Sequence, residues 1–490
     1  MGNPFRMCGR GLRYVRQYGP AQLYRKIKER RDRNRAEAGY EDWLAGQLAQ
    51  EKECMSEAGM AAEWPSFSIL VPAYETPEPF LRQMIESVLG QSYKNAELCI
   101  ADGSSSEQVQ RVAEEYRERD PRLQYKKLPE NRGISENTNA ALSMASGDYV
   151  GLLDHDDILL PGALFKIAEA LVKAGRPDAV YTDEDKVNPG LTRHFQPHFK
   201  PDFNLEYLCS NNYICHFFAV RRELALKAGG FQSGFDGAQD HDFILRCAEA
   251  ADRVLHVPEV LYSWRCHEAS TAANPESKLY AYEAGKRAVQ AHLERMGSAA
   301  EVLDTSNYGF YRLRYPRTDR KILIKSFENL NGQTGIKVVY YDKACNNSVT
   351  ISAEHTEEGQ ERYMLFTCVR NAEAGAGFWE EILSCCARPE VGIACARVYD
   401  RSRRLTSDIR MAGVQDPFGV STKGLKEGYS GYFHRVLLQQ EIESPTDCFL
   451  VREELLEGLE SFTVRELCEK IRRQGYRMVY DPWGVVYEGR

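Results

Sequence analysis

The sequence predicts an α/β fold, in which a mostly parallel sheet is covered by helices on both faces. Short apolar runs such as Phe67–Val71 and Tyr149–Leu153 have the length of buried strands, and they alternate with stretches such as Phe80–Leu89, whose apolar residues recur at helical spacing. Two of the expected strands end in acids, at Asp102 and Asp154. Because ligands of such sheets bind outside the carboxyl ends of the strands, both carboxylates should face one crevice.

The expected elements between residues 66 and 160 alternate regularly. The first strand stops at Pro72, because proline cannot donate a hydrogen bond to a sheet ladder. After the helix at 80–89 come the strand Leu98–Ala101, the polar helix Gln108–Arg119, the strand Leu123–Lys127, the helix Ser135–Met144 and the strand at 149–153.

Between residues 161 and 300 the pattern continues after Pro161, which suits the first turn of a helix. The expected elements are the strand Ala179–Thr182 leading to Asp183-Glu184-Asp185, a long loop at His194–Asn204, the apolar run Ile214–Val220, the helix Phe243–Glu249, and the strands Val254–Val260 and Leu261–Trp264. The three acids are expected either to lie under the donor sugar or to form a solvated acidic turn.

The cluster Asp154-His155-Asp156-Asp157 directly follows the strand at 149–153. Carboxylates this close repel one another unless a cation neutralises them, and Mg²⁺ and Mn²⁺ suit carboxylate oxygens. Such ions commonly hold diphosphates. A separate acid, Asp240, stands after Gln239 and can act as a base. A metal–diphosphate site with a distant base provides the groups needed to transfer a sugar from a nucleotide to a hydroxyl.

Bulk properties exclude several classes of protein. The net charge of −8 and the pI of about 5.8 argue against a nucleic-acid binder. The 14 cysteines show no zinc spacing, and several lie in apolar runs, as expected of reduced thiols in a cytosolic protein. No apolar stretch reaches the roughly 18 residues that span a bilayer. We therefore expect a cytoplasmic protein whose membrane contacts are peripheral.

Residues 1–65 are expected to form a basic helical segment. Between residues 6 and 35 arginine and lysine far outnumber the two acids, Glu29 and Asp32. Two interpretations stay open: a solvated helix packed on the main domain, and a helix on an anionic surface at the inner face of the cell membrane. Trp64-Pro65 has the character of a linker to the next domain.

The last third of the chain weakly repeats the middle third, which indicates an internal duplication. The corresponding pairs are Phe217–Arg222 with Cys448–Glu453, Gln239–Ala248 with Val464–Arg472, Arg253–Val257 with Tyr476–Tyr480, and Tyr149–Leu153 with Tyr363–Thr367. The copy has lost its acids, since Cys368-Val369-Arg370 replaces residues 154–156 and Val464 or Arg465 stands near the place of Asp240. We therefore expect a catalytic domain at 66–310 and a non-catalytic domain at 311–490.

Six ordered segments carry a resemblance to a known family. They are Ser68–Tyr74, Ala101–Ser105, Asn131–Ile134, Leu153–Asp157, Asp236–Asp242 and Tyr262–His267. In these segments, residues 66–270 resemble the GT-A domain of family-two glycosyltransferases, and the last third resembles the same family in a decayed form. The resemblance implies a GT-A fold, which is a Rossmann-like nucleotide-diphospho-sugar transferase fold, followed by a degenerate GT-A-like α/β domain. It also implies a role in bacterial cell-surface polysaccharide or cell-wall synthesis.

The resemblance places the nucleotide-sugar contacts at the ends of the strands. Base and ribose contacts fall on Pro72-Ala73-Tyr74-Glu75 and on Asp102 with Gly103, where a carboxylate can accept hydrogen bonds from uracil or ribose. The Arg132 guanidinium matches diphosphate oxygens. Further expected contacts are Asn137, Asp154, His155, Asp183 under the donor sugar, Gln239, Trp264 and Arg265.

The same resemblance makes Asp154 and Asp156 an Asp-x-Asp (DXD) motif. Asp156 is expected to bind the metal directly, and Asp154 to contact the ribose or metal-bound water, while Asp157 is a further candidate ligand. His267 is expected to complete the shell of Mn²⁺ or Mg²⁺.

The expected catalytic base is Asp240, with Asp242 as the alternative. A base at this place takes the proton from the acceptor hydroxyl on the face opposite the leaving group, so the anomeric centre should invert. General-base help of this kind contributes roughly 10²–10⁴-fold in rate.

These observations predict an inverting, metal-dependent glycosyltransferase, transferring a hexose or deoxyhexose from a UDP- or dTDP-sugar to a glycan or lipid-linked acceptor. One alternative is a non-catalytic scaffold that binds sugar nucleotides or glycans, which the intact acids oppose. Another is a nucleotidyltransferase, which needs a glycine- and lysine-rich phosphate loop that Pro72–Pro77 does not provide.

Overall fold

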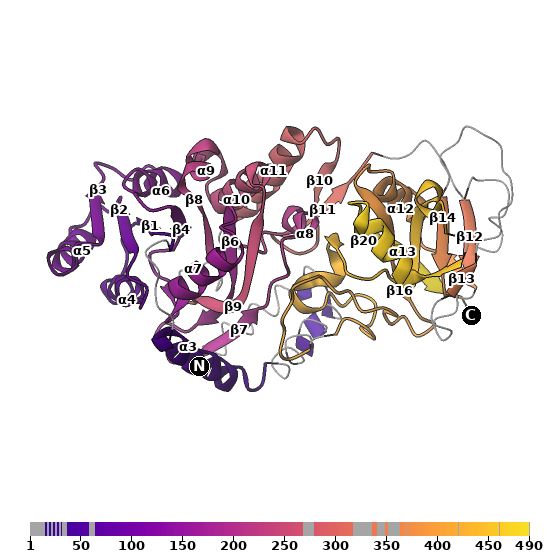
Figure 1. Ribbon diagram of the computed structural model, residues 1–490, viewed down its shortest axis with the longest axis horizontal. Helices are drawn as coiled ribbons and strands as arrows, with labels where there is room; N and C mark the ends of the chain where they lie inside the picture. Colours follow the sequence, from indigo (N-terminus) through magenta and orange to yellow (C-terminus); the bar gives the residue numbers. More distant parts are fainter. Residues whose placement is uncertain are drawn as a thin grey trace.

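The chain forms two α/β lobes that lie side by side along the long axis of the molecule (Figure 1). The computed structural model describes residues 64–267, 279–316 and 371–489 except 420 and 460, together with 37–57, 336–340, 348–350, 363–369 and isolated residues between 15 and 31. Most of the basic segment 6–35, and with it the expected membrane contact, lies outside the described residues. Within them, no helix is both long and apolar enough to cross a membrane.

The first lobe contains a nine-stranded sheet with the order β3-β2-β1-β4-β8-β6-β9-β5, in which β7 pairs with β6. Strands β1 to β4 are parallel neighbours, whereas β8 runs antiparallel to both β4 and β6. The carboxyl ends of β1, β2 and β4 therefore meet at one edge. The strands are β1 Phe67–Ala73, β2 Ala96–Asp102, β3 Leu123–Lys127, β4 Tyr149–Leu152, β5 Ile158–Leu159, β6 Ala179–Val187, β7 His194–His198, β8 Phe218–Arg221 and β9 Val254–Arg265.

Helices cover both faces of this sheet, as expected, because successive side chains of the buried strands point to opposite faces. Phe67, Ile69 and Val71 of β1 pack on one side and Leu70 on the other. On the first side lie α4 Glu78–Leu89, α5 Gln108–Arg119 and α7 Ala163–Lys173, and on the second lie α6 Ile134–Leu142, α9 Arg222–Lys227, α10 Gln239–Ala250 and α11 Leu279–Arg295.

Three expected elements differ from the structure. Strand β6 continues through Asp183-Glu184-Asp185, although the sequence predicted a strand that ends at Thr182, and this excludes the alternative of a solvated acidic turn. The stretch His194–Asn204 is not one long loop, since it contains β7, and the two expected strands between Val254 and Trp264 are a single strand. The acids can occupy a central strand because buried basic side chains and hydroxyl groups partner them, for example His256 at Asp183.

The second lobe repeats the strand order of the first. Its sheet order is β12-β14-β18-β16-β20-β15, and each neighbouring pair has the same sense as its counterpart in β1-β4-β8-β6-β9-β5. The elements are β12 Ile336–Tyr340, β14 Tyr363–Thr367, β15 Ala372–Ala374, α12 Phe378–Cys386, β16 Val391–Tyr399, β17 Gln440–Glu441, β18 Cys448–Arg452, α13 Val464–Arg473 and β20 Arg477–Glu488, with β13 Ser348–Thr350 paired to β19 Ser461–Thr463.

The repeat extends to the register of the strands. Val220 of β8 faces Ala179 of β6, and Val451 of β18 faces Ile393 of β16. Both lobes then interrupt the register of the next parallel pair at the same place, after Thr182 in β6 and after Ala396 in β16. The internal duplication is therefore visible in the backbone pairing itself.

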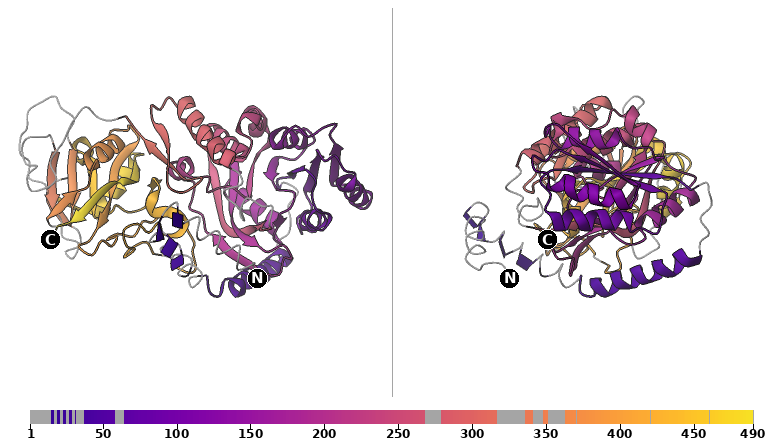
Figure 2. Two further views of the ribbon diagram at one scale, coloured as in Figure 1. Left: turned by 180° about the vertical axis from the view of Figure 1, so that it is seen from behind. Right: turned by 90° about the vertical axis from the view of Figure 1, so that its left-hand side faces the viewer.

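Two segments attach to the first lobe from outside its sheet. The hairpin of β10 Glu301–Asp304 and β11 Tyr311–Arg314 crosses the expected boundary at 310/311, and Tyr311 packs into the core of the first lobe. Helix α3, Tyr40–Glu57, lies along the side of the same lobe (Figure 2). It is anchored by the Tyr40 hydroxyl, which donates to Asp185 Oδ2 at 2.7 Å.

Candidate active site

Asp102, at the carboxyl end of β2, is buried and fully hydrogen-bonded. Its Oδ1 accepts from the Ser104 amide at 2.8 Å, and its Oδ2 accepts from the Tyr125 hydroxyl at 2.8 Å and from Lys127 Nζ at 2.9 Å. Burial and the neighbouring carboxylate raise the pKa of Tyr125. A cation on the neighbouring strand thus offsets the charge of this carboxylate and fixes its orientation.

The loop after β1 is tied to the loop after β2 through Glu75. The Glu75 carboxylate accepts from the Ser105 amide at 2.8 Å, from Ser105 Oγ at 2.7 Å and from Ser106 Oγ at 2.8 Å, and these hydrogen bonds lower its pKa to about 2. Its φ of +45° places it in the left-handed region, which a non-glycine residue adopts at a cost in strain. Tyr74, one residue earlier, exposes 49% of its surface.

Gly103 and Asn137 are in close contact beneath these loops. A Cβ on Gly103 would lie 2.7 Å from Asn137 Nδ2, so a larger residue here would displace the Asn137 side chain. Asn137 donates to Asn131 Oδ1 at 3.1 Å, while its own Oδ1 is buried without a hydrogen-bond partner among the described residues. Arg132 is exposed and pairs with Glu130 at 2.9 Å.

The acidic cluster after β4 contains one group of possible metal ligands. Asp154, Asp157 and His216 each offer one ligand atom, and these atoms lie within 4.8 Å of one another. Asp157 is fully buried and accepts from the Tyr262 hydroxyl at 2.5 Å and from the Arg265 amide at 2.7 Å. Burial raises the pKa of the Asp154 and Asp157 carboxyls, and the neighbouring acids raise it further. A bound cation would offset this concentrated negative charge.

A second pair of possible ligands lies beside the first group. His267 Nε2 is 2.7 Å from Asp156 Oδ2, so the structure brings together two residues that the sequence expected to share a metal. His155 instead contacts Thr76 Oγ1 through its Nδ1 at 2.9 Å. Carboxylates with imidazole suit Mn²⁺, and both groups therefore fit such an ion chemically.

Asp240 lies in the first turn of α10, near this cluster. Its Oδ2 accepts from Asn212 Nδ2 at 2.8 Å, and its charge is among those that raise the pKa of Asp154. Gln239 Oε1 accepts from the Gly237 amide at 2.9 Å and so helps to begin the helix. Asp242, the alternative base, is buried against Arg246 at 2.6 Å, which leaves Asp240 as the accessible acid of this turn.

Asp183 lies deeper than the sequence suggested. It is fully buried within β6, where its Oδ1 accepts from the Lys200 amide and from His256 Nε2, each at 2.8 Å. The next residue, Glu184, accepts from Lys200 Nζ at 3.2 Å and from the His216 amide at 3.1 Å. Burial alone would raise the pKa of Glu184, but Lys200, His198 and His216 together outweigh it and lower that pKa to about 2. Glu184 is therefore the acid of this triplet that supports the cluster at 154–157.

Trp264 and Arg265 end β9 beside the same cluster. Lys186 Nζ lies 5.5 Å from the centre of the Trp264 ring. Arg265 is fully buried, and its Nη1 donates to Gln83 Oε1 at 2.6 Å and to the Pro189 carbonyl at 2.8 Å. Its Nη2 is buried without a partner among the described residues. This guanidinium secures the segment after β9, and its contact with phosphate stays a prediction.

Three residues of the site were not anticipated from the sequence: Lys200, Asn212 and His216. They come from segments that have no motif spacing in the sequence. A partial signal existed for Lys200, because a lysine inside the aromatic stretch at 194–204 needs an acidic partner when it is buried.

Comparison with known proteins agrees with this geometry. Residues 68–229 match the model of glycosyl transferase family 2. The first lobe is a family 2 glycosyltransferase domain. It has the GT-A fold that the sequence predicted, and the described second lobe repeats its strand order. The matched range includes the acidic cluster at 154–157, whereas Asp240 and His267 of this glycosyltransferase lie beyond it.

Curated relatives extend the similarity over more of the chain. The uncharacterized protein y4gI of Sinorhizobium fredii is 32% identical over 482 residues, which cover 86% of this chain and 53% of that protein. The O-antigen biosynthesis protein RfbC of Myxococcus xanthus is 35% identical over 281 residues, which cover 57% of this chain and 22% of that protein. The chain thus spans about half the length of the first relative and about a fifth of the second.

Among solved structures, residues 1–349 of S. aureus TarS in complex with UDP-GlcNAc match 46% of this chain and 66% of that chain. The identity is 20% and the TM-score is 0.38.

Proposed function

We propose that this chain is an inverting, metal-dependent glycosyltransferase of cell-surface polysaccharide synthesis. Its donor is a UDP- or dTDP-sugar, and its acceptor is a hydroxyl of a glycan or lipid-linked glycan at the cytoplasmic face of the membrane. The observation that carries the proposal is the position of Asp240, held by Asn212 close enough to the acidic cluster for its charge to act on Asp154. The O-antigen role of RfbC and the chondroitin synthases among the relatives support the substrate class.

The residues at the strand ends have different roles, since some contact the nucleoside and others hold the metal ion. The exposed Tyr74 contacts the nucleoside, and the buried Asp102 fixes the loop after β2 through the Ser104 amide. Asn137 Oδ1 is a buried acceptor without a hydrogen-bond partner among the described residues. Asp154, Asp156 and His267 hold Mn²⁺ or Mg²⁺, an ion that would neutralise the diphosphate as the nucleotide leaves. The carboxylates and imidazole of the Asp154, Asp157 and His216 group are the alternative site for the same ion.

Asp240 takes the proton from the acceptor hydroxyl. A half-buried carboxylate that accepts one hydrogen bond from Asn212 keeps its second oxygen available for a substrate. Because it lies on a different element from the acidic cluster, it can approach the sugar from the face opposite the leaving nucleotide, which gives inversion.

The test is calorimetric titration of the chain with UDP-, dTDP- and GDP-sugars, with Mn²⁺ or with EDTA, alongside a transfer assay with the donor that binds. Asp240→Asn should keep donor binding and lose roughly 10²–10⁴-fold in transfer rate. Asp156→Asn should lose metal-dependent donor binding. Full transfer by Asp240→Asn would refute its role as the base, and a folded chain that binds no donor would favour a glycan-binding scaffold.

A further inference from the structure

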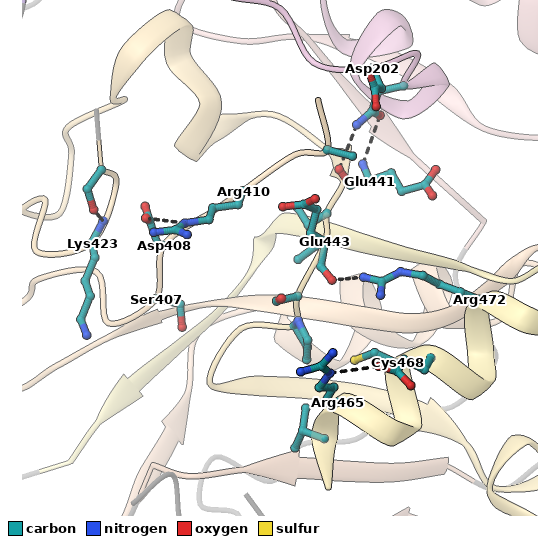
Figure 3. A pocket seen from close by; sticks show the side chains of 18 of the residues that line it. Asp202, Ser407, Asp408, Arg410, Lys423, Glu441, Glu443, Arg465, Cys468 and Arg472 are labelled. Carbon is teal, nitrogen blue, oxygen red and sulfur yellow. Dashed lines mark hydrogen bonds and ion pairs between the residues drawn. The ribbon is translucent and has the colours of Figure 1, made fainter. Parts of the chain in front are cut away.

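A cavity of about 990 Å³ opens between the two lobes (Figure 3). Its walls come from residues 202–204 of the first lobe, from the loops around residues 406–412 and 421–423, from residues 441–445 and from one side of α13. Two hydrogen bonds between the lobes fix these walls: the Asp202 amide donates to the Ala412 carbonyl at 2.8 Å, and Asn204 Nδ2 donates to the Glu441 carbonyl at 2.9 Å. Its volume lies near the upper end of the usual range for ligand pockets, about 300–1,000 Å³.

The duplication explains where this cavity lies. Strand β18 holds the place of β8, and the segment before each strand is equivalent, so that Glu443 corresponds to Asn212. Helix α13 likewise corresponds to α10, and both helices follow those strands. In the first lobe the two segments meet through Asn212 and Asp240. In the second lobe the equivalent segments are walls of the cavity, so the cavity lies on the side that corresponds to the Asn212–Asp240 side of the first lobe.

The residues of this side suit binding rather than transfer. Near the place of the base Asp240 stands Arg465, a residue that cannot accept a proton at neutral pH. The Arg472 guanidinium donates to the Glu443 carbonyl, and this contact links two parts of the cavity wall (Figure 3). This side of the second lobe therefore lacks the acid that Asp240 supplies in the first lobe.

The wall carries both signs of charge. Arg465 pairs with Glu469 at 3.0 Å and Arg410 with Asp408 at 3.0 Å, while Asp202 faces them from the other lobe (Figure 3). A polyanion would meet these carboxylates and be repelled. Sugar hydroxyls both donate and accept, so carboxylates and guanidinium groups side by side can satisfy them.

The cavity and the catalytic base are joined by a short helix. Helix α8, Leu205–Ser210, begins after Asn204 at the cavity and ends just before Asn212 at the base. Six residues of α-helix span about 9 Å. The cavity and the segment that holds Asp240 are therefore separated by only the length of this helix.

We propose that this cavity, lined by Lys423 and Arg465 among others, binds an uncharged segment of the acceptor glycan and holds it while the growing end reaches Asp240. The proposal rests on the glycosyltransferase function above, because that function supplies the reason for a glycan to lie here.

The test measures glycan binding without a donor. The full chain is titrated with neutral hexasaccharides of glucose, mannose, galactose and N-acetylglucosamine, and with a hyaluronan hexasaccharide as the acidic comparison. At least one neutral hexasaccharide should bind, and the double variant Lys423→Ala/Arg465→Ala should weaken that binding about tenfold. Arg465 leaves 88% of its side chain exposed, so its loss should not disturb folding.

Arg473→Ala is the matched control. Arg473 also pairs with Glu469, at 3.3 Å, and lies on the same helix, but it does not line the cavity. Binding in this variant should equal that of the unmodified chain. The inference is overturned if no neutral hexasaccharide binds, if only the acidic one binds, or if the double variant binds as well as the control. Glycan binding that follows the prediction in a chain that binds no sugar nucleotide would instead refute the proposed enzyme and leave the cavity as a glycan site.

Discussion

At the residue scale, the site depends on Lys200, a buried lysine that belongs to no sequence motif. Lys200 is fully buried, and its Nζ donates to Glu184 and to the carbonyls of Ile214 and His216. It thereby neutralises one acid and holds the segment that carries His216 and Asn212. A buried ion pair of this kind is costly to break, because the remaining charge stays desolvated.

Lys200→Met should therefore destabilise the protein by about 3–5 kcal/mol. The measurement is the urea dependence of the first lobe's unfolding. Adding Glu184→Gln to the same variant should recover part of that loss, since it removes the unpaired charge. Equal stability of the single and the double variant would show that the ion pair is not the source of the effect.

At the scale of elements, α10 is braced against α11. Glu249 of α10 accepts from His292 Nδ1 at 2.8 Å and from Arg295 Nη2 at 2.6 Å, both on α11. Burial would raise the pKa of Glu249, but these hydrogen bonds outweigh it and hold the pKa below its ordinary value of 4.5. Because α10 also carries Asp240, these contacts help to fix the position of the proposed base.

A lowered folded-state pKa contributes stability above the unfolded value of 4.5, and this contribution is lost as the pH falls through the folded value. Glu249→Gln should thus cost about 1–2 kcal/mol at neutral pH. The difference between the two proteins in thermal unfolding should shrink below pH 4.5 and disappear in stronger acid. A difference that stays constant with pH would mean that packing, not charge, is responsible.

At the scale of the whole molecule, buried polar contacts join the lobes. Arg388 of the second lobe donates to Glu206 Oε1 of α8 at 2.8 Å and to the Tyr315 hydroxyl at 2.7 Å. Nearby, Arg435 Nη2 donates to the Phe199 carbonyl at 2.6 Å. Helix α8 lies between the proposed base and the interlobe cavity, so the second lobe contacts the element that leads to Asp240.

Arg388→Ala should leave Glu206 buried without its main partner and cost about 3–5 kcal/mol. In scanning calorimetry the two lobes should then unfold in separate steps. Arg403→Ala is the control, because Arg403 is 56% exposed and lies away from the lobe interface, and its trace should match that of the unmodified chain. A single unchanged transition in Arg388→Ala would contradict a structural role for this pair.

The local pattern of apolar residues in the sequence was sufficient to predict much of the fold. The strands β1 to β4, with their helices, follow from short apolar runs alternating with helical spacing, and the duplication follows from repeated segments such as Cys448–Glu453. The pairing of Asp156 with His267 was also anticipated, through family resemblance. These features are encoded over a few residues at a time, where periodicity and motif spacing carry the information.

The sequence by itself determined the fold class, the repeat and the chemical types gathered at the strand ends. Only the tertiary structure decided that Glu184 rather than Asp183 supports the cluster, that Lys200 and His216 join it, and that a cavity opens between the lobes. Those outcomes depend on pairing between residues far apart in the chain and on which face of a strand is buried. A one-residue shift along a strand reverses that face, so local pattern alone does not determine it.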